Sequence, residues 1–293
     1  MPYNSYICKR KHNNYFKMKK IFLITILLSV LYGCKTVPIT GRRQVSFIPA
    51  ATMNSLAATS YQETIAASKL STNAEQTAMI KRTGERISKA VEQYMAEKNM
   101  SSALKGFKWE FVLIEDPAVN AWCMPGGKVA FYTGILPICQ NEAGVAVVMG
   151  HEIAHAVANH GGERMSQGLL VQMGGLTLAT ALKDKPELTQ QLALAAFGVG
   201  SAVFGTLPYS RLHEYEADRL GLIFMAMAGY DPNEAPKFWE RMQALSGNKS
   251  ASDFLSTHPS NEKRISELKE AIPEAMQYFR PHTPQTPQTQ QRQ

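Results

Sequence analysis

The stretch from Val147 to His160, VVMGHEIAHAVANH, constrains the fold more than any other part of the sequence. It carries two histidines four residues apart in a segment otherwise rich in Ala, Val, Ile and Met. Because an α-helix turns by about 100° per residue, His151 and His155 would lie about 40° apart on one face, with Glu152 within about 100° of both. The sequence therefore predicts an apolar helix that places three ionisable side chains around one point.

The segment reads H-E-x-x-H, the spacing in which two imidazoles bind zinc and the glutamate acts as a general base. The alternative is a surface face, or a pair of core histidines satisfied by hydrogen bonds. The apolar flanks disfavour that alternative, because burying ionisable groups costs desolvation free energy that a metal ion offsets. His160 follows His151 by nine residues, about 180° round the same helix, and is interpreted as a structural histidine.

The formal charge of +7 comes mostly from the N-terminus. Residues 1–33 hold six of the 31 basic residues and none of the 24 acidic ones, so the rest of the chain is almost neutral and nucleic acid is not an expected partner. Lys19-Lys20 before IFLITILLSVLYG is typical of a signal peptide, and the apolar run is short for a membrane span. Met18 would begin a signal peptide of ordinary length, so the preceding residues are interpreted as a misplaced start or a long basic region.

The leader ends in LYGC, at Cys34. This resembles a bacterial lipobox, in which the cysteine is lipidated and becomes the mature N-terminus, although Tyr32 is bulkier than the usual residue at its position. The membrane is therefore an expected partner through Cys34, and in a Gram-negative cell Lys35 favours the outer membrane, facing the periplasm. Cys123 and Cys139 could form a disulfide or remain two buried thiols.

Hydrophobic periodicity predicts the elements around the motif. Residues 50–95 have a helical pattern, and FKWEFVLIED at 107–116 alternates as a strand does. GGKVAFYTGIL, which follows Pro125, predicts a second strand opened by a Pro-Gly-Gly turn. The H-E-x-x-H helix is expected to begin near Asn141.

Two apolar stretches, roughly 168–182 and 191–207, are separated by KDKPELTQ. Each is shorter than the roughly 20 residues of a membrane span, so they predict a helical hairpin packed on the domain, which could also act as a lid. Residues 34–50 contain Pro, Gly and basic side chains and are expected to form a tether. Residues 281–293 are rich in Pro, Gln and Thr and are expected to be disordered.

The acids of EYEAD are candidates for a further ligand. Glu214 and Asp218 share a helical face, but spacing alone does not decide between Glu214 and Glu216. At this point the chain resembles peptidase family M48, zinc metallopeptidases that include the CAAX prenyl proteases, mitochondrial Oma-type proteases and bacterial periplasmic lipoprotein proteases. The matching motifs, spread in the family's order over residues 120–264, are NAWCMPGGKVAFYTGIL, VVMGHEIAHAVANHGGERMS, SRLHEYEADRLG and THPSNEKR.

The resemblance implies an α+β, mainly helical fold over residues 51–280, a zincin-like (gluzincin) metallopeptidase domain with a small β-sheet beside the H-E-x-x-H helix. It also implies one Zn²⁺ per chain, held by His151, His155 and Glu214. Asp218 matches the family residue that orients a ligating histidine.

Three protein ligands leave one zinc position for water, and Glu152 is the expected general base. His258 and Arg264 match family residues near the metal and are expected to stabilise the oxyanion. The alternative for this segment is a helix-capping loop, since His-Pro-Ser precedes Glu262.

The strand in PGGKVAFYTG resembles the sheet edge along which these enzymes lay an extended substrate. This resemblance assigns substrate binding to Lys128 and Val129, with Asn120, Gly126 and Gly127 shaping the entrance. The alternative is an ordinary hairpin.

The resulting expectation is a zinc endopeptidase of the cell envelope that hydrolyses misfolded or stalled envelope proteins. One alternative is a chaperone-like lipoprotein that binds unfolded polypeptides without cleaving them. The other is a membrane-embedded CAAX-type protease, which requires several membrane spans.

Overall fold

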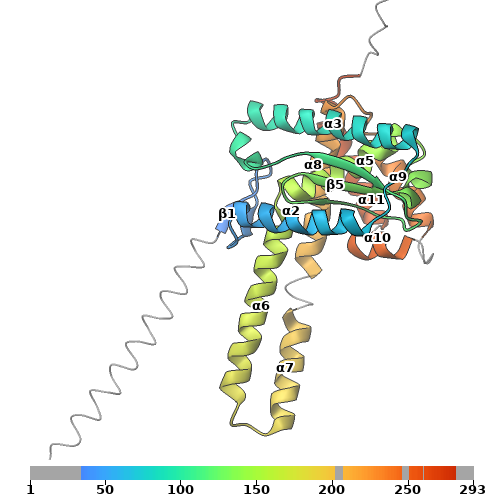
Figure 1. Cartoon of the computed structure of the whole chain (residues 1–293). Coiled ribbons are helices and arrows are strands. Elements are labelled where there is room, and N and C mark those ends of the chain that lie inside the picture. The colour runs from blue at the N-terminus through green and yellow to red at the C-terminus, as the bar shows by residue number, and fades with distance from the viewer. Residues whose placement is uncertain (1–33, 202–206, 246–250, 260, 282–293) are drawn as a thin grey trace, which may run out of the picture.

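The computed structural model describes residues 34–201, 207–245, 251–259 and 261–281. The expected leader, residues 1–33, and all but the first residue of the expected disordered tail lie outside this part of the chain. Helices surround a small three-stranded sheet (Figure 1), so the expected mainly helical α+β architecture is confirmed.

The body is formed by two long N-terminal helices, the sheet and a C-terminal group of helices. Its elements in chain order are α2 (Ala50–Ala67), α3 (Ala74–Glu97), η1 (Ser101–Leu104), β3 (Glu110–Ile114), β4 (Ala121–Met124), β5 (Lys128–Tyr132), η2 (Thr133–Ile135), α4 (Leu136–Cys139), α5 (Glu142–Val157), α8 (Leu207–Met227), α9 (Glu234–Ala244), α10 (Ser252–Thr257) and α11 (Glu262–Met276). Two further units flank it: a β-hairpin of β1 (Cys34–Thr36) and β2 (Arg43–Val45), and a helical hairpin of α6 (His160–Leu182) and α7 (Glu187–Ser201).

In the sheet, the strand order is β3-β5-β4. Strand β5 pairs in parallel with β3 and antiparallel with β4, with Cys123 opposite Val129. The Pro-Gly-Gly turn lies between β4 and β5, where Gly126 and Gly127 both have φ of +83°, a conformation that favours glycine. The strand that carries Lys128 and Val129 is therefore central, and the expectation that it forms an edge is wrong. Periodicity finds a strand but does not identify its neighbours, and β4 is only four residues long.

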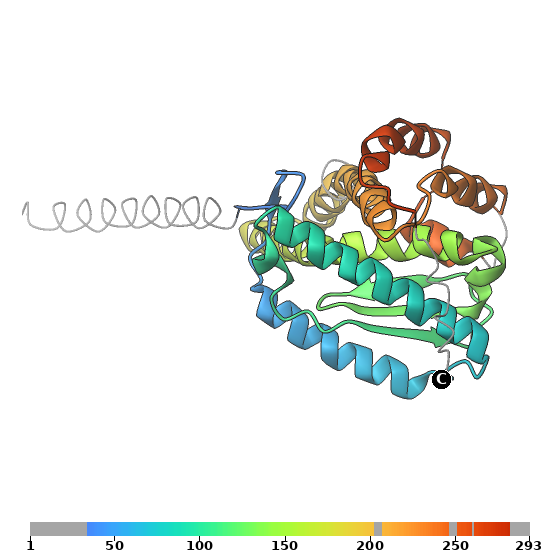
Figure 2. The same ribbon diagram turned by 90° about the horizontal axis from the view of Figure 1, so that it is seen from above.

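Helix α5 carries H-E-x-x-H and lies in the middle of the body (Figure 2), with the sheet on one side and α8 on the other. Asn141 caps its first turn, where its side chain accepts a hydrogen bond of 3.0 Å from the Gly144 N–H. The helix ends at Val157, and Asn159 has the left-handed φ of +57° before α6 begins. His160 therefore does not continue α5, and the helical angle expected between it and His151 is wrong.

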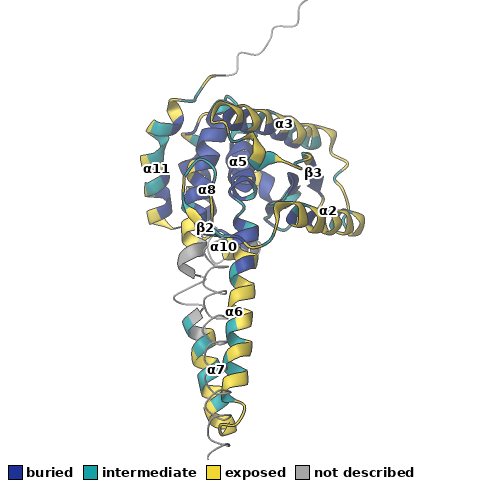
Figure 3. Ribbon diagram, turned by 90° about the vertical axis from the view of Figure 1, so that its left-hand side faces the viewer, coloured by how far each residue is buried: buried dark blue, intermediate teal, exposed yellow. Residues whose placement is uncertain are grey.

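The close packing of α5 on α8 depends on two glycines. A Cβ added at Gly150 would lie 2.8 Å from the carbonyl oxygen of Gly221. A Cβ added at Gly221 would lie 2.9 Å from the backbone nitrogen of His151. Only glycine fits both positions without a shift of backbone. This approach brings the acids of α8 over the histidines of α5, and Figure 3 shows both helices largely buried within the body.

The α6–α7 hairpin extends away from the body (Figures 1 and 3). A helical hairpin was expected, but its packing on the domain was not observed: α7 packs mainly on α6, and both expose large apolar side chains such as Met173, Leu176 and Leu188. Within the described ranges, no helix combines the length and apolar character that crossing a membrane requires.

The segment expected to be a tether is partly folded. Residues 34–45 form the antiparallel β1–β2 hairpin, in which Val37 and Gln44 are buried. The two internal cysteines are free thiols: Cys139 is buried in α4 and Cys123 is half-buried in β4. The free-thiol alternative therefore applies to this pair.

Candidate metal centre

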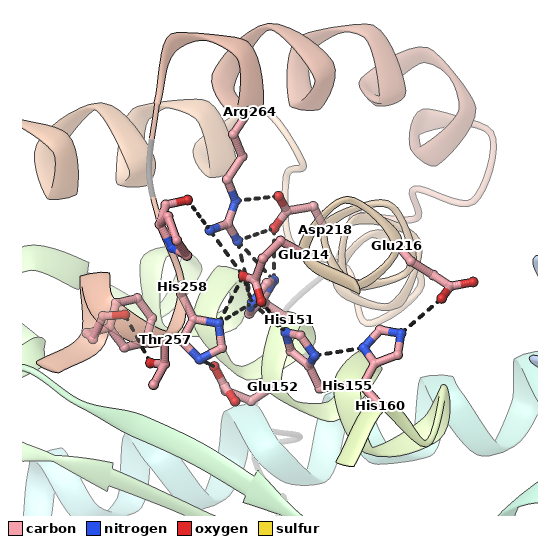
Figure 4. A network of polar contacts seen from close by, with 12 residues as sticks. His151, Glu152, His155, His160, Glu214, Glu216, Asp218, Thr257, His258 and Arg264 are labelled. Atoms are coloured by element: carbon pink, nitrogen blue, oxygen red, sulfur yellow. Dashed lines mark hydrogen bonds and ion pairs between the residues drawn. The ribbon is translucent and has the colours of Figure 1, made fainter. Parts of the chain in front are cut away.

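Four buried side chains gather above α5 (Figure 4): His151, His155, Glu214 and His258, whose ligand atoms all lie within 4.8 Å of one another. The Nε2 atoms of His151 and His155 are 3.0 Å apart. Each lies 3.3 Å from a different carboxylate oxygen of Glu214. Helices α5 and α8 thus aim two imidazoles and one carboxylate at a common point.

The chemistry of these donors fits a divalent cation. Two imidazole nitrogens at 3.0 Å would repel each other if both presented lone pairs, and a cation between them removes that repulsion. Histidine nitrogen and carboxylate oxygen are ligands typical of zinc. Glu214 faces the histidines, whereas Glu216 lies on the far side of α8, so the structure distinguishes the two acids that spacing left open.

Glu152 lies beside this cluster (Figure 4). Its Oε1 atom is buried and accepts no hydrogen bond from the described part of the chain. The Nε2 atom of His258 lies 3.4 Å from this oxygen. A buried carboxylate oxygen without a donor is poised to accept a proton from a reacting group.

His151 is held from behind by a direct carboxylate contact. Its Nδ1 lies 2.8 Å from Asp218 Oδ1, one turn along α8 from Glu214. Arg264 in turn donates to both oxygens of Asp218, at 2.6 Å from Nε and 2.8 Å from Nη2. A metal-ligating histidine commonly donates its other ring N–H to such a carboxylate, which fixes its tautomer and orientation.

Arg264 is fully buried among protein groups. Besides Asp218, its Nη1 contacts Glu214 at 3.2 Å and donates to the Pro259 carbonyl at 3.1 Å. The guanidinium also stacks on Trp239, 3.5 Å from the ring centroid. These contacts show Arg264 holding Asp218 and Glu214, and its expected role in stabilising an oxyanion stays a prediction.

His155 is held from behind by a second imidazole. Its Nδ1 lies 2.7 Å from Nδ1 of His160, and Nε2 of His160 lies 2.9 Å from Glu216 (Figure 4). His160, interpreted from the sequence only as structural, is therefore in contact with a candidate ligand. The signal that could have revealed it is Asn159, which tolerates the left-handed conformation that ends α5.

The two candidate ligand histidines have opposite pKa shifts. Burial alone would lower the pKa of His151, but hydrogen bonds and charge from Asp218 and Glu214 raise it to about 9. Burial lowers the pKa of His155 well below its usual value despite Glu214. Before a metal binds, His151 is therefore the histidine that carries a proton near pH 7.

The expected substrate residues mostly stabilise the sheet. Val129 is fully buried, and Lys128 donates a hydrogen bond of 2.7 Å to the Lys108 carbonyl and pairs with Glu110. The Asn120 carbonyl accepts from Tyr132 at 3.0 Å. The strand beside α5 is instead β4, the outer strand on that side of the sheet.

The comparisons with known proteins agree with this geometry. The sequence profile described as Peptidase family M48 matches residues 81–272. The mitochondrial metalloendopeptidase OMA1 of Schizosaccharomyces pombe is 41% identical over 192 residues, 64% of this chain and 53% of that protein. OMA1 of Arabidopsis thaliana is 40% identical over 182 residues, 61% of this chain and 35% of that protein. The beta-barrel assembly-enhancing protease of Escherichia coli (strain K12) is 28% identical over 167 residues, 55% of this chain and 34% of that protein. The chain thus matches between about a third and about half of the length of these relatives.

Proposed function

The chain belongs to peptidase family M48, and from that premise we propose that it is a zinc-dependent endopeptidase that hydrolyses peptide bonds of protein substrates. The observation that carries the proposal is the buried cluster of His151, His155 and Glu214 with the unpaired Glu152 oxygen beside it. The three side chains would hold the ion and would leave one of its ligand positions for water, with Glu152 close to the cluster.

A zinc ion held there would lower the pKa of a bound water toward about 7 and polarise the peptide carbonyl. Glu152 would take the proton that this water releases and return it to the departing amine. Its buried, undonated oxygen is suited to that exchange, because no protein hydrogen bond has to break first. Asp218 and Arg264 would act indirectly, by orienting His151 and Glu214.

His258 is assigned to the developing oxyanion. Its ring spans the site, with Nδ1 3.0 Å from Glu214 and Nε2 3.4 Å from Glu152. A donor at this position would stabilise negative charge that forms on the substrate carbonyl. The same proximity makes His258 a fourth candidate ligand, which zinc analysis of His258→Ala would reveal.

We assign the substrate to the outer strand β4, Ala121–Met124, rather than to β5. An extended polypeptide that adds to a sheet edge is bound through backbone groups, which gives little preference for sequence. Asn120, Gly126 and Gly127 flank this strand and would shape the two ends of such a groove. Recognition of this kind suits unfolded chains.

The proposed substrates are misfolded or stalled proteins of the cell envelope. Support comes from the similarity to the beta-barrel assembly-enhancing protease of Escherichia coli, a protease named for its effect on beta-barrel assembly. The proposed location is the periplasmic face of the outer membrane, with lipidated Cys34 as the anchor.

A time course of casein cleavage with Glu152→Gln tests the reaction. The substitution keeps the size of the side chain and removes the base, so zinc content should equal that of the wild type while cleavage slows at least about a hundredfold. His258→Ala should lower turnover by a smaller factor. The exposed Glu63→Gln serves as the matched control and should cleave at the wild-type rate.

Equal cleavage by Glu152→Gln and wild type at equal zinc loading would exclude Glu152 as the base. Stable capture of unfolded protein without cleavage by either would favour the chaperone-like alternative.

A further inference from the structure

The β1–β2 hairpin lies at one end of the body, beside the start of the chain that the structure describes (Figure 2). Strand β2 contacts α6, the Phe47 N–H donates to Ser166 at 3.1 Å, and Asn159 donates to Ser46 at 3.1 Å. These contacts hold the segment against the beginning of α6. Residues 34–46 all precede residue 81, where the match to the family profile begins.

Arg42, at the end of the turn between the two strands, is directed inward. Its Nη1 and Nη2 donate to the two oxygens of Glu163 at 3.0 and 2.7 Å, and its Nε donates to Glu216 at 2.8 Å. Thr40 also donates to Glu216. Both glutamates are buried, and they come from different helices, α6 and α8. Loss of one partner from such a buried ionic array leaves charge without compensation.

A chain of contacts continues from Glu216 to the metal centre. Glu216 lies 2.9 Å from His160 Nε2, and His160 Nδ1 lies 2.7 Å from His155 Nδ1. If His155 binds metal through Nε2, its Nδ1 carries the hydrogen and donates to His160. His160 must then accept at Nδ1 and donate from Nε2, for which Glu216 is the acceptor. Only this order of hydrogens satisfies both contacts.

His213 completes the surroundings of this array. Its ring stacks on that of His160 with centroids 4.2 Å apart, and its Nε2 lies 2.9 Å from Glu163. Two histidines and two glutamates could suggest a second metal site. The guanidinium of Arg42 excludes that interpretation, because it already lies between the two carboxylates, where a cation would have to bind.

We propose that Arg42 is a positioning residue of the metal centre: by holding Glu216, it keeps His160 in the orientation and tautomer that His155 needs to bind zinc. The inference rests on the proposed zinc site and adds to it a residue from outside the matched family region. The segment directly after Cys34 is then part of the metal centre.

Zinc affinity of the full-length chain, purified in detergent and titrated against a competing chelator, tests the proposal. Arg42→Ala should weaken zinc binding about 10- to 100-fold, the range typical when the partner of a ligating histidine is lost. Arg42→Lys, which keeps the charge without the fork of donors, should recover part of that loss. The exposed neighbour Arg43→Ala is the matched control and should bind as the wild type does.

A double-mutant cycle separates positioning from general stability. Arg42→Ala and Glu216→Gln should each weaken zinc binding, and together they should lose no more than about the larger single effect, because both act through His160. The absorption spectrum of the Co²⁺-substituted protein should change in both variants. Glu216→Gln also avoids leaving an unpaired charge, should Arg42→Ala fail to fold.

If wild type binds one zinc and Arg42→Ala matches Arg43→Ala in affinity and in its Co²⁺ spectrum, the positioning role is overturned and the proposed function stands. Fully additive effects in the cycle would also overturn it. A wild-type chain that binds no zinc would overturn the proposed function itself.

Discussion

The two histidines of α5 lie one turn apart, yet they are held from behind in different ways. His151 contacts the carboxylate of Asp218 directly, and Arg264 of the C-terminal helix α11 holds that carboxylate. His155 contacts a second imidazole, His160, before the array reaches a carboxylate and an arginine. One array is built from helices of the body, whereas the other ends on the N-terminal hairpin.

Both histidines contact Glu214, but only His151 also contacts a second carboxylate, Asp218, and this second contact decides which of the two carries a proton. Direct contact with Asp218 helps raise the pKa of His151 to about 9, although burial opposes it. With a neutral ring interposed, burial keeps the pKa of His155 well below its usual value. Similar positions on one helix can therefore bind the same ion with different proton competition.

The largest effect is expected at Glu214, which contacts both His151 and His155. Glu214→Ala removes the carboxylate that contacts both histidines and should reduce zinc affinity and cleavage more than about 100-fold, beyond the range typical of partners that do not touch the metal. Elemental analysis of the dialysed protein gives the zinc content per chain. A full zinc complement in this variant would assign the third ligand to another residue.

Asp218→Asn breaks the direct array alone. It leaves an acceptor of the same size but removes the charge, so zinc affinity should fall about 10- to 100-fold. Chelator competition measures the loss, with Glu63→Gln as a control on the protein surface. A smaller loss than that of Glu216→Gln would reverse the comparison and make the longer array the more important one.

The dependence of zinc affinity on pH distinguishes the two histidines. His151, with a pKa of about 9, must lose a proton when zinc binds near neutral pH, whereas His155 has none to lose. Near pH 6, where a metal-bound water with a pKa of about 7 would keep its proton, affinity should therefore rise about tenfold per pH unit, with one proton released per zinc. Calorimetry in buffers of different ionisation enthalpy counts the protons. Release of two protons would show that both histidines are charged before binding.

Cys34→Ser should affect the metal centre least. It removes the proposed lipid anchor at the start of β1 and leaves Arg42 in place, so the protein should leave the membrane fraction with unchanged zinc affinity. Sedimentation after a salt wash checks the first result. A variant that still sediments would point to the apolar α6–α7 hairpin, or another segment, as a membrane attachment.

The sequence predicted one array better than the other for a physical reason. Helical spacing places His151 and His155 on one face of α5. Asp218 was identified because the motif EYEAD resembles the family's motif. Arg42 lies 121 positions from Glu163 and 174 positions from Glu216 in the sequence, so no local sequence pattern predicts these contacts. The angle expected between His160 and His151 was wrong because α5 does not continue through the left-handed Asn159.

The sheet shows the same limit. Strand β5 was predicted correctly as a strand, but its place in the sheet depends on the pairing partners that tertiary structure chooses. The strand at the outer edge, AWCM, has too short a pattern to be recognised. Hydrophobic alternation in the sequence therefore could not predict which strand lies at the edge of the sheet.

The contact between Gly150 and Gly221 has a consequence for how this protein can evolve. Where side chains separate two helices, a substitution at one position can be accommodated when a neighbouring side chain adopts another rotamer. Here backbone touches backbone, so the spacing between the histidines and Glu214 has no adjustable part. A mutational scan for lost activity should therefore identify Gly150 and Gly221, although neither carries a reactive side chain. Each of the two glycines restricts the substitutions that the other position tolerates.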